Sequence, residues 1–220
     1  YLQDFSLARD GQQIAFTFRG ALHVMPPWGG APKCLSASPG ERYKLPTFYR
    51  AENHQHQLLA IRMDQETDER LVSFNTKTRT SKTLLKDATL GKVQQIKIHP
   101  KDKYAAIANN RNQLWLVGLG QKRTVELIEQ NPYVEPFQTL DWSPCGRYLA
   151  YQGAKGHDKK GVYVYDTQTK KSRELITPIL NDSHAKFSLD GNFLYFFGVR
   201  EFYPAMSEAH FDLSFPYAER

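Results

Sequence analysis

The sequence lacks most of the features that mark a membrane protein or a common class of enzyme. It has only two cysteines, Cys34 and Cys145, so we expect two free thiols rather than a disulfide framework. No apolar run approaches the ~20 residues that span a bilayer, and the longest, FLYFFGV at 193–199, is typical of a buried strand. Walker-type, GxGxxG and GxSxG motifs are also absent. A bilayer-spanning segment, a phosphate-binding loop and a nucleophile elbow are therefore not expected.

The charge is positive but is not concentrated in one tract. A net charge of +6 is compatible with a nucleic-acid partner. The basic residues are scattered, or lie in polar connections at 76–82 and 155–161 where hydroxyl and acidic residues interrupt them. We therefore expect solvated loops and no nucleic-acid partner. Aromatic residues make up 13% of the chain, which favours an ordered, β-rich protein.

A short phrase recurs along the chain at a fixed interval. Five stretches align without gaps, at 8–16, 51–61, 99–107, 143–151 and 188–196. Their anchor positions, about 45 residues apart, are Gly11, His56, Asp102, Gly146 and Gly191. Four residues beyond each anchor stand Ala15, Ala60, Ala106, Ala150 and Tyr195, a small residue in four of the five copies. A constant period with a constant register predicts one structural unit repeated along the chain.

The sequence of each repeat predicts a turn between two strands. Asp10-Gly11 and Asp190-Gly191 are typical of tight β-hairpin turns, whereas His56 and Asp102 predict looser turns or turns of another type. The fourth repeat contains four candidate strands, at 137–143, 147–153, 161–166 and 172–176. Four antiparallel strands per ~45 residues is the unit of a β-propeller blade.

We therefore predict an all-β fold, a β-propeller with five four-stranded blades in this chain. The expected blade limits are 1–40, 41–88, 89–130, 131–178 and 179–220. The competing fold is a sandwich of short strands, which would need no fixed period.

The repeat resembles the SPDG…IAF propeller repeats of TolB-like proteins and of tricorn-type proteases. The order of segments is most similar to the later blades of the seven-bladed tricorn propeller. The stretches that carry this resemblance lie at 4–24, 107–119, 149–166, 192–204 and 210–220. The resemblance implies a non-catalytic module that gates or guides peptides toward a separate serine-protease domain, in a parent chain that is a serine-type peptidase. None of that family's catalytic residues has a matching position here.

A seven-bladed ring would need more blades than the five anchors indicate. An open ring leaves two apolar faces unburied, which costs more than a typical domain's stability of ~5–15 kcal/mol. Three arrangements would bury these two faces. Either the five blades close into a small ring, or another subunit covers the faces, or further blades lie upstream. We expect upstream blades in the parent chain.

No residue pattern points to chemistry within this chain. Ser143 and Ser188 precede turns, where a hydroxyl bonds the local backbone. Cys145 occupies a turn and predicts an exposed, unremarkable thiol. His54 and His56 form too small a set for zinc, and Asp141 has no recognisable partner carboxylate. We expect no catalytic residue, no metal and no cofactor.

Propellers bind ligands along their axis, beside the innermost strand of each blade. Counting back seven and five places from the anchors gives a mixed polar set that either binds extended or acidic-ended peptides or is simply solvated. From this set, the candidate binding residues are Asp4, Tyr49, Gln95, Lys97, Thr139, Asp141, His184 and Lys186. Ser6 and Ala51 complete the predicted lining.

The expected partners follow from the resemblance. They are peptides or unfolded polypeptide segments, the neighbouring domains of a larger protease chain and, in a homo-oligomer, further copies, with no membrane partner. The expected location is the cytoplasm, with the periplasm as the alternative. The second function considered is a stand-alone TolB-like scaffold for protein–protein interaction, and the third is a propeller glycosidase or lactonase.

Overall fold

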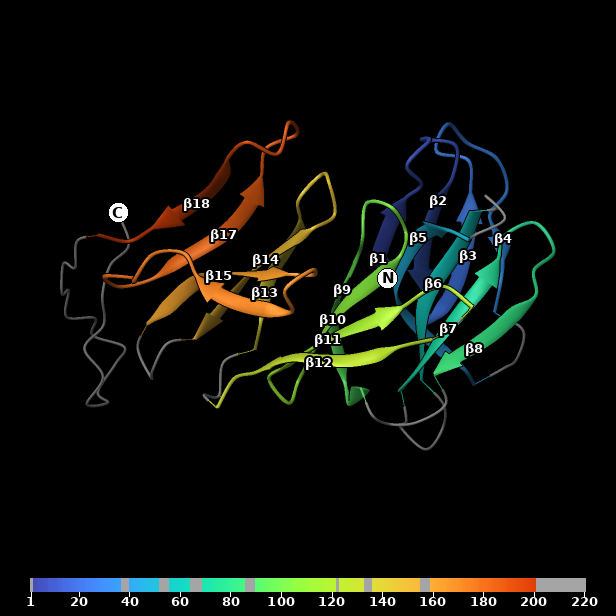
Figure 1. The fold of residues 1–220 in the computed structure, drawn as a ribbon. Helices are drawn as coiled ribbons and strands as arrows, with labels where there is room; N and C mark the ends of the chain where they lie inside the picture. Colours follow the sequence, from blue (N-terminus) through green and yellow to red (C-terminus); the bar gives the residue numbers. More distant parts are fainter. Residues whose placement is uncertain are drawn as a thin grey trace, which may run out of the picture.

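The computed structural model describes residues 2–36, 40–51, 56–63, 69–85, 90–121, 123–132, 136–154 and 159–200. Strands are the regular elements that position this part of the chain, and they form five antiparallel sheets, each built from consecutive strands (Figure 1). In the same residues, no helix has the length and apolar character needed to cross a membrane.

We name the sheets blades 1 to 5 in chain order. Blade 1 contains β1 (Leu2–Leu7), β2 (Ile14–Phe18), β3 (Ala21–Met25) and β4 (Lys33–Cys34). Blade 2 contains β5 (Arg42–Arg50), β6 (His56–Met63), β7 (Glu69–Asn75) and β8 (Ser81–Leu85). Blade 3 contains β9 (Val93–Ile98), β10 (Tyr104–Asn109), β11 (Gln113–Gly118) and β12 (Val125–Gln130). Blade 4 contains β13 (Gln138–Trp142), β14 (Tyr148–Ala154), β15 (Lys160–Asp166) and β16 (Lys171–Glu174), and blade 5 contains β17 (Asp182–Phe187) and β18 (Leu194–Gly198).

The blades stand side by side with their first strands together. β1 contacts β5, β5 contacts β9, β9 contacts β13, and β13 contacts β17, whereas the outermost strands β12 and β16 touch sparingly. The row runs from blades 1 and 2 at one end to blade 5 at the other (Figure 1). This is the arrangement of a β-propeller, with β1, β5, β9, β13 and β17 innermost. The predicted fold is therefore confirmed, while the exact blade limits stay a prediction.

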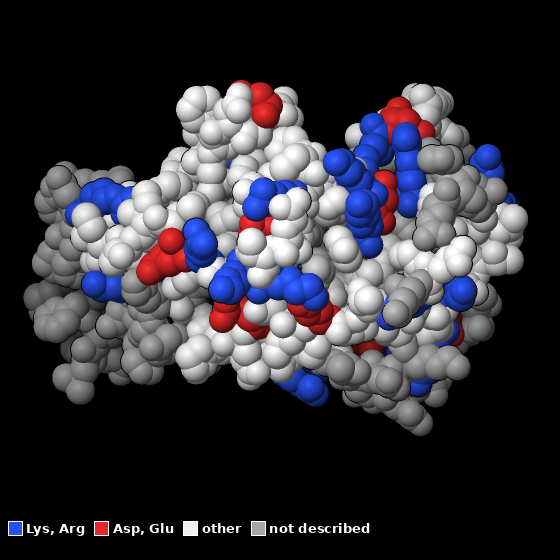
Figure 2. All heavy atoms as spheres, viewed as in Figure 1, with Lys and Arg blue, Asp and Glu red and all other residues white. Residues whose placement is uncertain are grey.

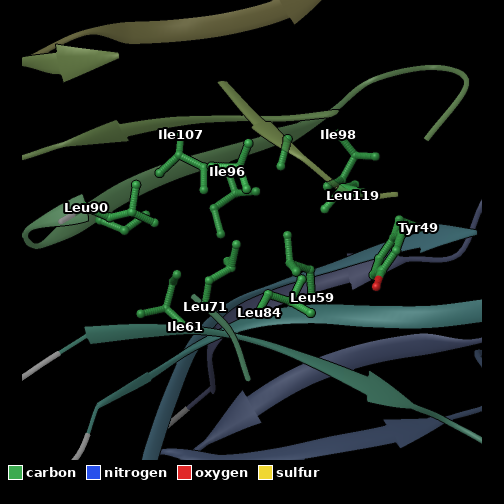
Figure 3. Packing of buried hydrophobic residues seen from close by; sticks show 13 residues of the cluster. Tyr49, Leu59, Ile61, Leu71, Leu84, Leu90, Ile96, Ile98, Ile107 and Leu119 are labelled. Atoms are coloured by element: carbon green, nitrogen blue, oxygen red, sulfur yellow. The ribbon is translucent and has the colours of Figure 1, made fainter. Parts of the chain in front are cut away.

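The hydrophobic core lies between the blades and not within them. Four clusters of buried residues each join one blade to the next. Figure 3 shows the cluster between blades 2 and 3, where Leu59 and Ile61 of β6 face Ile96 and Ile107 of blade 3. Neighbouring residues of one strand serve opposite sides, because side chains alternate along a strand. Each internal blade therefore has two apolar faces, and both are covered.

The small residue of the repeat lies where adjacent blades approach. Its copies in the first four blades are fully buried and each pairs with a branched residue of the third strand. The pairs are Ala15 with Val24, Ala60 with Val72, Ala106 with Leu116, and Ala150 with Val164. In blade 5 the position holds Tyr195, which is 62% exposed. The predicted register is confirmed by these pairings.

Four of the five anchors form the same turn. Gly11, Asp102, Gly146 and Gly191 all have a left-handed backbone, with φ between 55° and 81°. In each, the anchor N–H donates to the carbonyl oxygen three residues earlier, at 2.8–3.0 Å. Asp102 therefore adopts the turn of the glycine copies, and the expectation of a looser turn there is wrong. Aspartate is among the few non-glycine residues that tolerate this conformation.

The anchor of blade 2 departs from this pattern. His56 is the first residue of β6 and pairs with Arg50, so it lies in the ladder instead of the turn. In blade 2 the anchor position is therefore shifted out of the turn and into the second strand. His54 lies outside the described residues.

The two end blades carry large apolar side chains that are exposed in the described part of the chain. In blade 1 these are Leu2, Phe5, Leu7 and Phe18, and in blade 5 they are Phe193, Tyr195 and Phe197. Phe5 is 69% exposed and Phe197 is 74% exposed. Contiguous exposed apolar residues mark surfaces that bind another protein element.

The turn at Gly146 predicts a contrast between two equivalent glycines. A Cβ at Gly146 would collide with the buried ring of His99, whereas a Cβ at Gly11 would meet nothing within 4 Å. We expect Gly146→Ala to lower the free energy of unfolding by about 3 kcal/mol, through left-handed strain and overpacking. Gly11→Ala, the matched control, adds only the strain of about 1 kcal/mol. Equal losses in chemical denaturation would contradict the assigned packing.

Candidate channel-facing site

The inner strands are bent by β-bulges. The ladder between the first two strands shifts register in all five blades. In three of these bulges a non-glycine residue has a left-handed backbone, namely Leu45 (φ 54°), Thr139 (φ 52°) and His184 (φ 55°). Such residues cost roughly 1–2 kcal/mol each, so the surrounding contacts must hold them in place. Bulges also change the direction of nearby side chains.

Carboxylates of one blade hold the main chain of the next. Asp4 Oδ2 accepts the N–H of Leu45, the left-handed bulge residue of blade 2, at 3.0 Å. Asp141 Oδ2 accepts the N–H of Phe187 in blade 5 at 3.0 Å. Two of the predicted binding residues are thus committed to links between blades. A charged acceptor makes such a hydrogen bond roughly twice as strong as a neutral one.

The structure brings two of the predicted residues together. Lys97 Nζ lies 3.2 Å from Asp141 Oδ1, so the inner strands of blades 3 and 4 share an ion pair. Because Asp141 also accepts from Phe187, its carboxylate connects three successive blades. The Lys97 side chain remains 41% exposed. On the face shown in Figure 2, basic and acidic side chains are intermingled and no single sign covers the surface.

The other candidates have different environments. Tyr49 is 4% exposed, and its hydroxyl lies within hydrogen-bonding distance of Gln57 (2.6 Å) and Ser73 (2.7 Å) in the core between blades 2 and 3. Gln95 and Thr139 are half-buried. His184 and Lys186 are exposed on β17, and the His184 ring packs against Phe197. Whether any of the eight binds a ligand stays a prediction.

A buried ion pair joins blades 2 and 3, and the sequence gives no sign of it. Glu69, at the start of β7, lies 2.6 Å from Lys44 Nζ and accepts the N–H of Val93 at 2.6 Å. Lys44 also donates to the carbonyl oxygen of Val93 at 2.7 Å. Glu69 is 7% exposed, so its carboxylate depends on these protein contacts and not on water for its hydrogen bonds. Lys44 and Glu69 both belong to blade 2, and their shared contact, Val93, is the first residue of β9 in blade 3.

Arg9 makes a link that passes over one blade. Its guanidinium donates to the carbonyl oxygens of His99 (2.9 Å) and Pro100 (2.5 Å) and to Asp102 Oδ2 (3.1 Å). Arg9 belongs to the first turn of blade 1, whereas its acceptors form the corresponding turn of blade 3. The end of β5 in blade 2 lies between them and borders the same small hollow. Three blades are therefore fixed at this end of the inner strands.

His99 connects the same turn of blade 3 to blade 4. Nε2 of His99 lies 2.9 Å from the carbonyl oxygen of Gly146, and Nδ1 accepts the N–H of Lys101 at 2.9 Å. The buried ring packs edge-on against Trp142, with ring centroids 4.9 Å apart. These bonds require a neutral imidazole with its proton on Nε2. Burial lowers the pKa of His99, and the charges of Lys103, Lys101 and Arg9 lower it further.

The serines and cysteines considered as possible nucleophiles show no catalytic arrangement in the described residues, and both serine hydroxyls bond the nearby backbone. Ser143 Oγ accepts the N–H of Tyr148 at 2.9 Å, and Ser188 Oγ accepts that of Phe193 at 3.0 Å. The prediction that these hydroxyls bond the local backbone is confirmed. Cys34 and Cys145 are both free, as predicted, and Cys145 is exposed, as predicted; Cys34 is exposed as well. Within the described residues, no group of three or more His, Cys, Asp or Glu side chains is placed to hold a metal ion.

His99 predicts a dependence of stability on pH. Its pKa in the folded protein is below the ordinary value of 6.5, so below that pH the unfolded chain binds a proton that the folded chain does not. The contribution is complete above pH 6.5 and is lost as the pH falls, by up to about 1.4 kcal/mol per pH unit. We expect His99→Gln to reduce the slope of unfolding free energy between about pH 5 and 6.5. His184→Gln, at an exposed histidine, is the control, and an unchanged slope in His99→Gln would refute this role.

Arg9 predicts a second stability effect. Two of its three acceptors are main-chain carbonyls, so Arg9→Ala removes more than the ion pair with Asp102. We expect Arg9→Ala to cost about 1–2 kcal/mol and Asp102→Asn less than about 1 kcal/mol, because exposed ion pairs contribute little. Urea titrations of the two variants give the comparison. An Asp102→Asn loss as large as that of Arg9→Ala would be inconsistent with the main-chain link.

Similarity to known proteins agrees with this geometry. The chain is 28% identical over 214 residues to a putative Tricorn-like protease C-terminal subunit of Sulfurisphaera tokodaii, covering 96% of this chain and 23% of the relative. The crystal structure of the tricorn protease matches with a TM-score of 0.78 and 20% identity, covering 99% of this chain and 20% of that one. TolB from Acinetobacter baumannii matches with a TM-score of 0.62 and 14% identity, over 94% of this chain and 49% of TolB. At these identities the two structural likenesses show the fold alone.

The match to a family model decides the family. The chain spans less than a quarter of the length of the tricorn relatives it matches. The model of the tricorn protease second β-propeller domain matches residues 2–220, nearly the whole chain. The tricorn-type resemblance seen in the repeats is thereby confirmed. The chain belongs to the family of the tricorn protease second β-propeller domain.

Proposed function

We propose that this propeller guides or gates peptide substrates on their way to a separate serine-protease domain of a larger chain. The observation that carries the proposal is the family match over residues 2–220. The names of the relatives, which are tricorn-like proteases, support it, as does the small part of those relatives that the chain covers. The wider chain supplies the neighbouring domains in this proposal, and the cytoplasm is its proposed location.

The residues of the inner strands support a guiding role without chemistry. Lys97, His184 and Lys186 place donors beside the proposed axis, and Asp141 adds a carboxylate. Extended peptides present unpaired backbone groups that such a polar surface can bind weakly. Among the described residues neither Ser143 nor Ser188 is hydrogen-bonded to a histidine, because both hydroxyls cap turns. The nucleophile of the proposed peptidase is therefore assigned to another domain.

Lys186 offers a test in the full-length protein. It is exposed on the innermost strand β17, whereas Lys171 is exposed on the outermost strand β16 of blade 4. We expect Lys186→Glu to change kcat/KM for peptides of about fifteen residues by threefold or more, through altered electrostatic guidance. Lys171→Glu is the matched charge reversal and should leave it unchanged.

A comparison of short and long peptide substrates provides the control for this experiment. A short chromogenic peptide reports on the protease domain itself, so both variants should cleave it as the native protein does. Loss of activity toward short and long peptides alike would indicate damage to the whole protein. Unaltered cleavage of the long peptide by Lys186→Glu would count against passage along β17.

A further inference from the structure

A cavity of about 100 Å³ lies between blades 3 and 4, apart from the inner strands. It is lined by the end of β12 and the residues after it, by the end of β14, and by residues of blade 4 nearby. The lining residues are Glu129, Gln130, Asn131, Pro132, Phe137, Tyr151, Gly153, Ala154 and Tyr163. Because Gln138 pairs with Gln152, this is the end of blade 4 opposite the turn at Gly146. The link made by His99 is therefore remote from the cavity.

Three aromatic rings form the walls of this cavity. The rings of Tyr151 and Tyr163 are stacked, with centroids 5.6 Å apart and an angle of 15° between their planes. Phe137 stands edge-on to Tyr151 at 5.5 Å and 78°. Phe137 and Tyr151 are both buried, so packing with their neighbours fixes their orientation. Two of the three walls are therefore held in place by the core between blades 3 and 4.

Gly153 keeps the space between these rings open. A Cβ at this position would lie 3.3 Å from the ring of Tyr163 and 3.4 Å from that of Phe137. Any side chain larger than a methyl group would extend further into the space between these rings. The volume of the cavity thus depends on the absence of a side chain here.

Glu129 is the one formally charged residue in the described lining. Its Oε2 accepts the hydroxyl of Tyr151 at 3.2 Å, which uses one of roughly four lone-pair positions of the carboxylate. In the described part of the chain, Glu129 takes part in no ion pair, unlike Glu126 on the same strand, which lies 3.0 Å from Lys170. Aromatic faces carry negative electrostatic potential, as the carboxylate does. The cavity therefore favours a cation.

We propose that this cavity binds an alkylammonium group, with Glu129 pairing the charge and the rings of Phe137, Tyr151 and Tyr163 packing against the aliphatic stem. A lysine side chain of a peptide or protein and a free alkylamine share this chemistry. An anion is disfavoured by Glu129, and a neutral aliphatic group leaves the charge of the carboxylate unpaired. The inference goes beyond the proposed function, because it concerns the outer part of two blades and not the axis.

Calorimetric titration of the full-length protein tests the proposal with defined probes. Nα-acetyl-lysine methylamide should bind, and the norleucine analogue, which lacks the charge, should bind about tenfold more weakly or not at all. Butylammonium chloride, a free alkylamine, distinguishes the two possible ligands, a lysine side chain and a free amine. Equal affinity of butylammonium and the lysine probe assigns the site to free amines, and tighter binding of the lysine probe assigns it to peptide side chains.

Two variants and one control locate the binding. Glu129→Gln removes the charge and should weaken the lysine probe about tenfold. Gly153→Val fills the cavity without altering charge and should abolish binding, while Glu126→Gln on the same strand should leave it within about twofold. Circular dichroism and thermal melting confirm that each variant is folded.

Three results would overturn the proposal. They are no binding of the lysine probe to the native protein, equal binding of the norleucine analogue, and equal losses in Glu129→Gln and Glu126→Gln. The readout is a binding isotherm and does not depend on peptide cleavage. A failure here is therefore distinguishable from a failure of the proposed guiding function.

Discussion

Burial of each sheet by its neighbours is the interaction on which the remaining structure depends. Ala105 of β10 belongs to the cluster with blade 2, and the next residue, Ala106, belongs to the cluster with blade 4. One strand thus contributes to two cores, because its side chains alternate between faces. At about 25 cal/mol per Å² of apolar surface, this burial is the main source of stability, and no blade has a core of its own. The exposed Phe5 and Phe197 mark the faces where the same burial is unmet within the described residues.

Polar contacts between blades are made largely to main-chain atoms. Asp4, Glu69 and Asp141 each accept an N–H group of the following blade, and Trp142 Nε1 donates to the carbonyl oxygen of Lys97 at 3.2 Å. Apolar faces slide easily because their attraction has no direction, whereas hydrogen bonds fix one position. A main-chain partner is present whatever residue occupies the next blade. The two kinds of contact therefore divide the tasks of holding the blades together and setting their register.

Much of the fold could be predicted from the sequence, because the determining features are local and repeated. Gly11 and Gly146 each lie in the same hairpin as the alanine four places later, so their spacing can be recognised in the sequence itself. Blade 2 shows the limit of this reasoning. Its anchor, His56, lies in the second strand instead of the turn, so counting back from His56 led to Tyr49, which is buried in the core.

The contacts of the candidate site could not be predicted in the same way. Arg9 and Asp102 are 93 residues apart, and Glu69 and Val93 meet only after two sheets have stacked. Nothing in the local pattern around these residues distinguishes them from other surface charges. The cavity beside Glu129 depends in addition on a residue without a side chain, Gly153, placed between rings from separate segments. Such features follow from the packing of blades and become visible only in three dimensions.

The reach of Arg9 has a consequence for how this molecule comes apart. A row of repeats that touch only their neighbours opens in independent steps, and its stability is a sum of nearest-neighbour contributions. Arg9 adds a next-nearest contribution, since it ties the first blade to the third across the second. Blade 2 is thereby enclosed between partners that are themselves connected. Blades 1 to 3 form a single cooperative unit, whereas blade 5, which has only one neighbour in the described chain, is free to open separately.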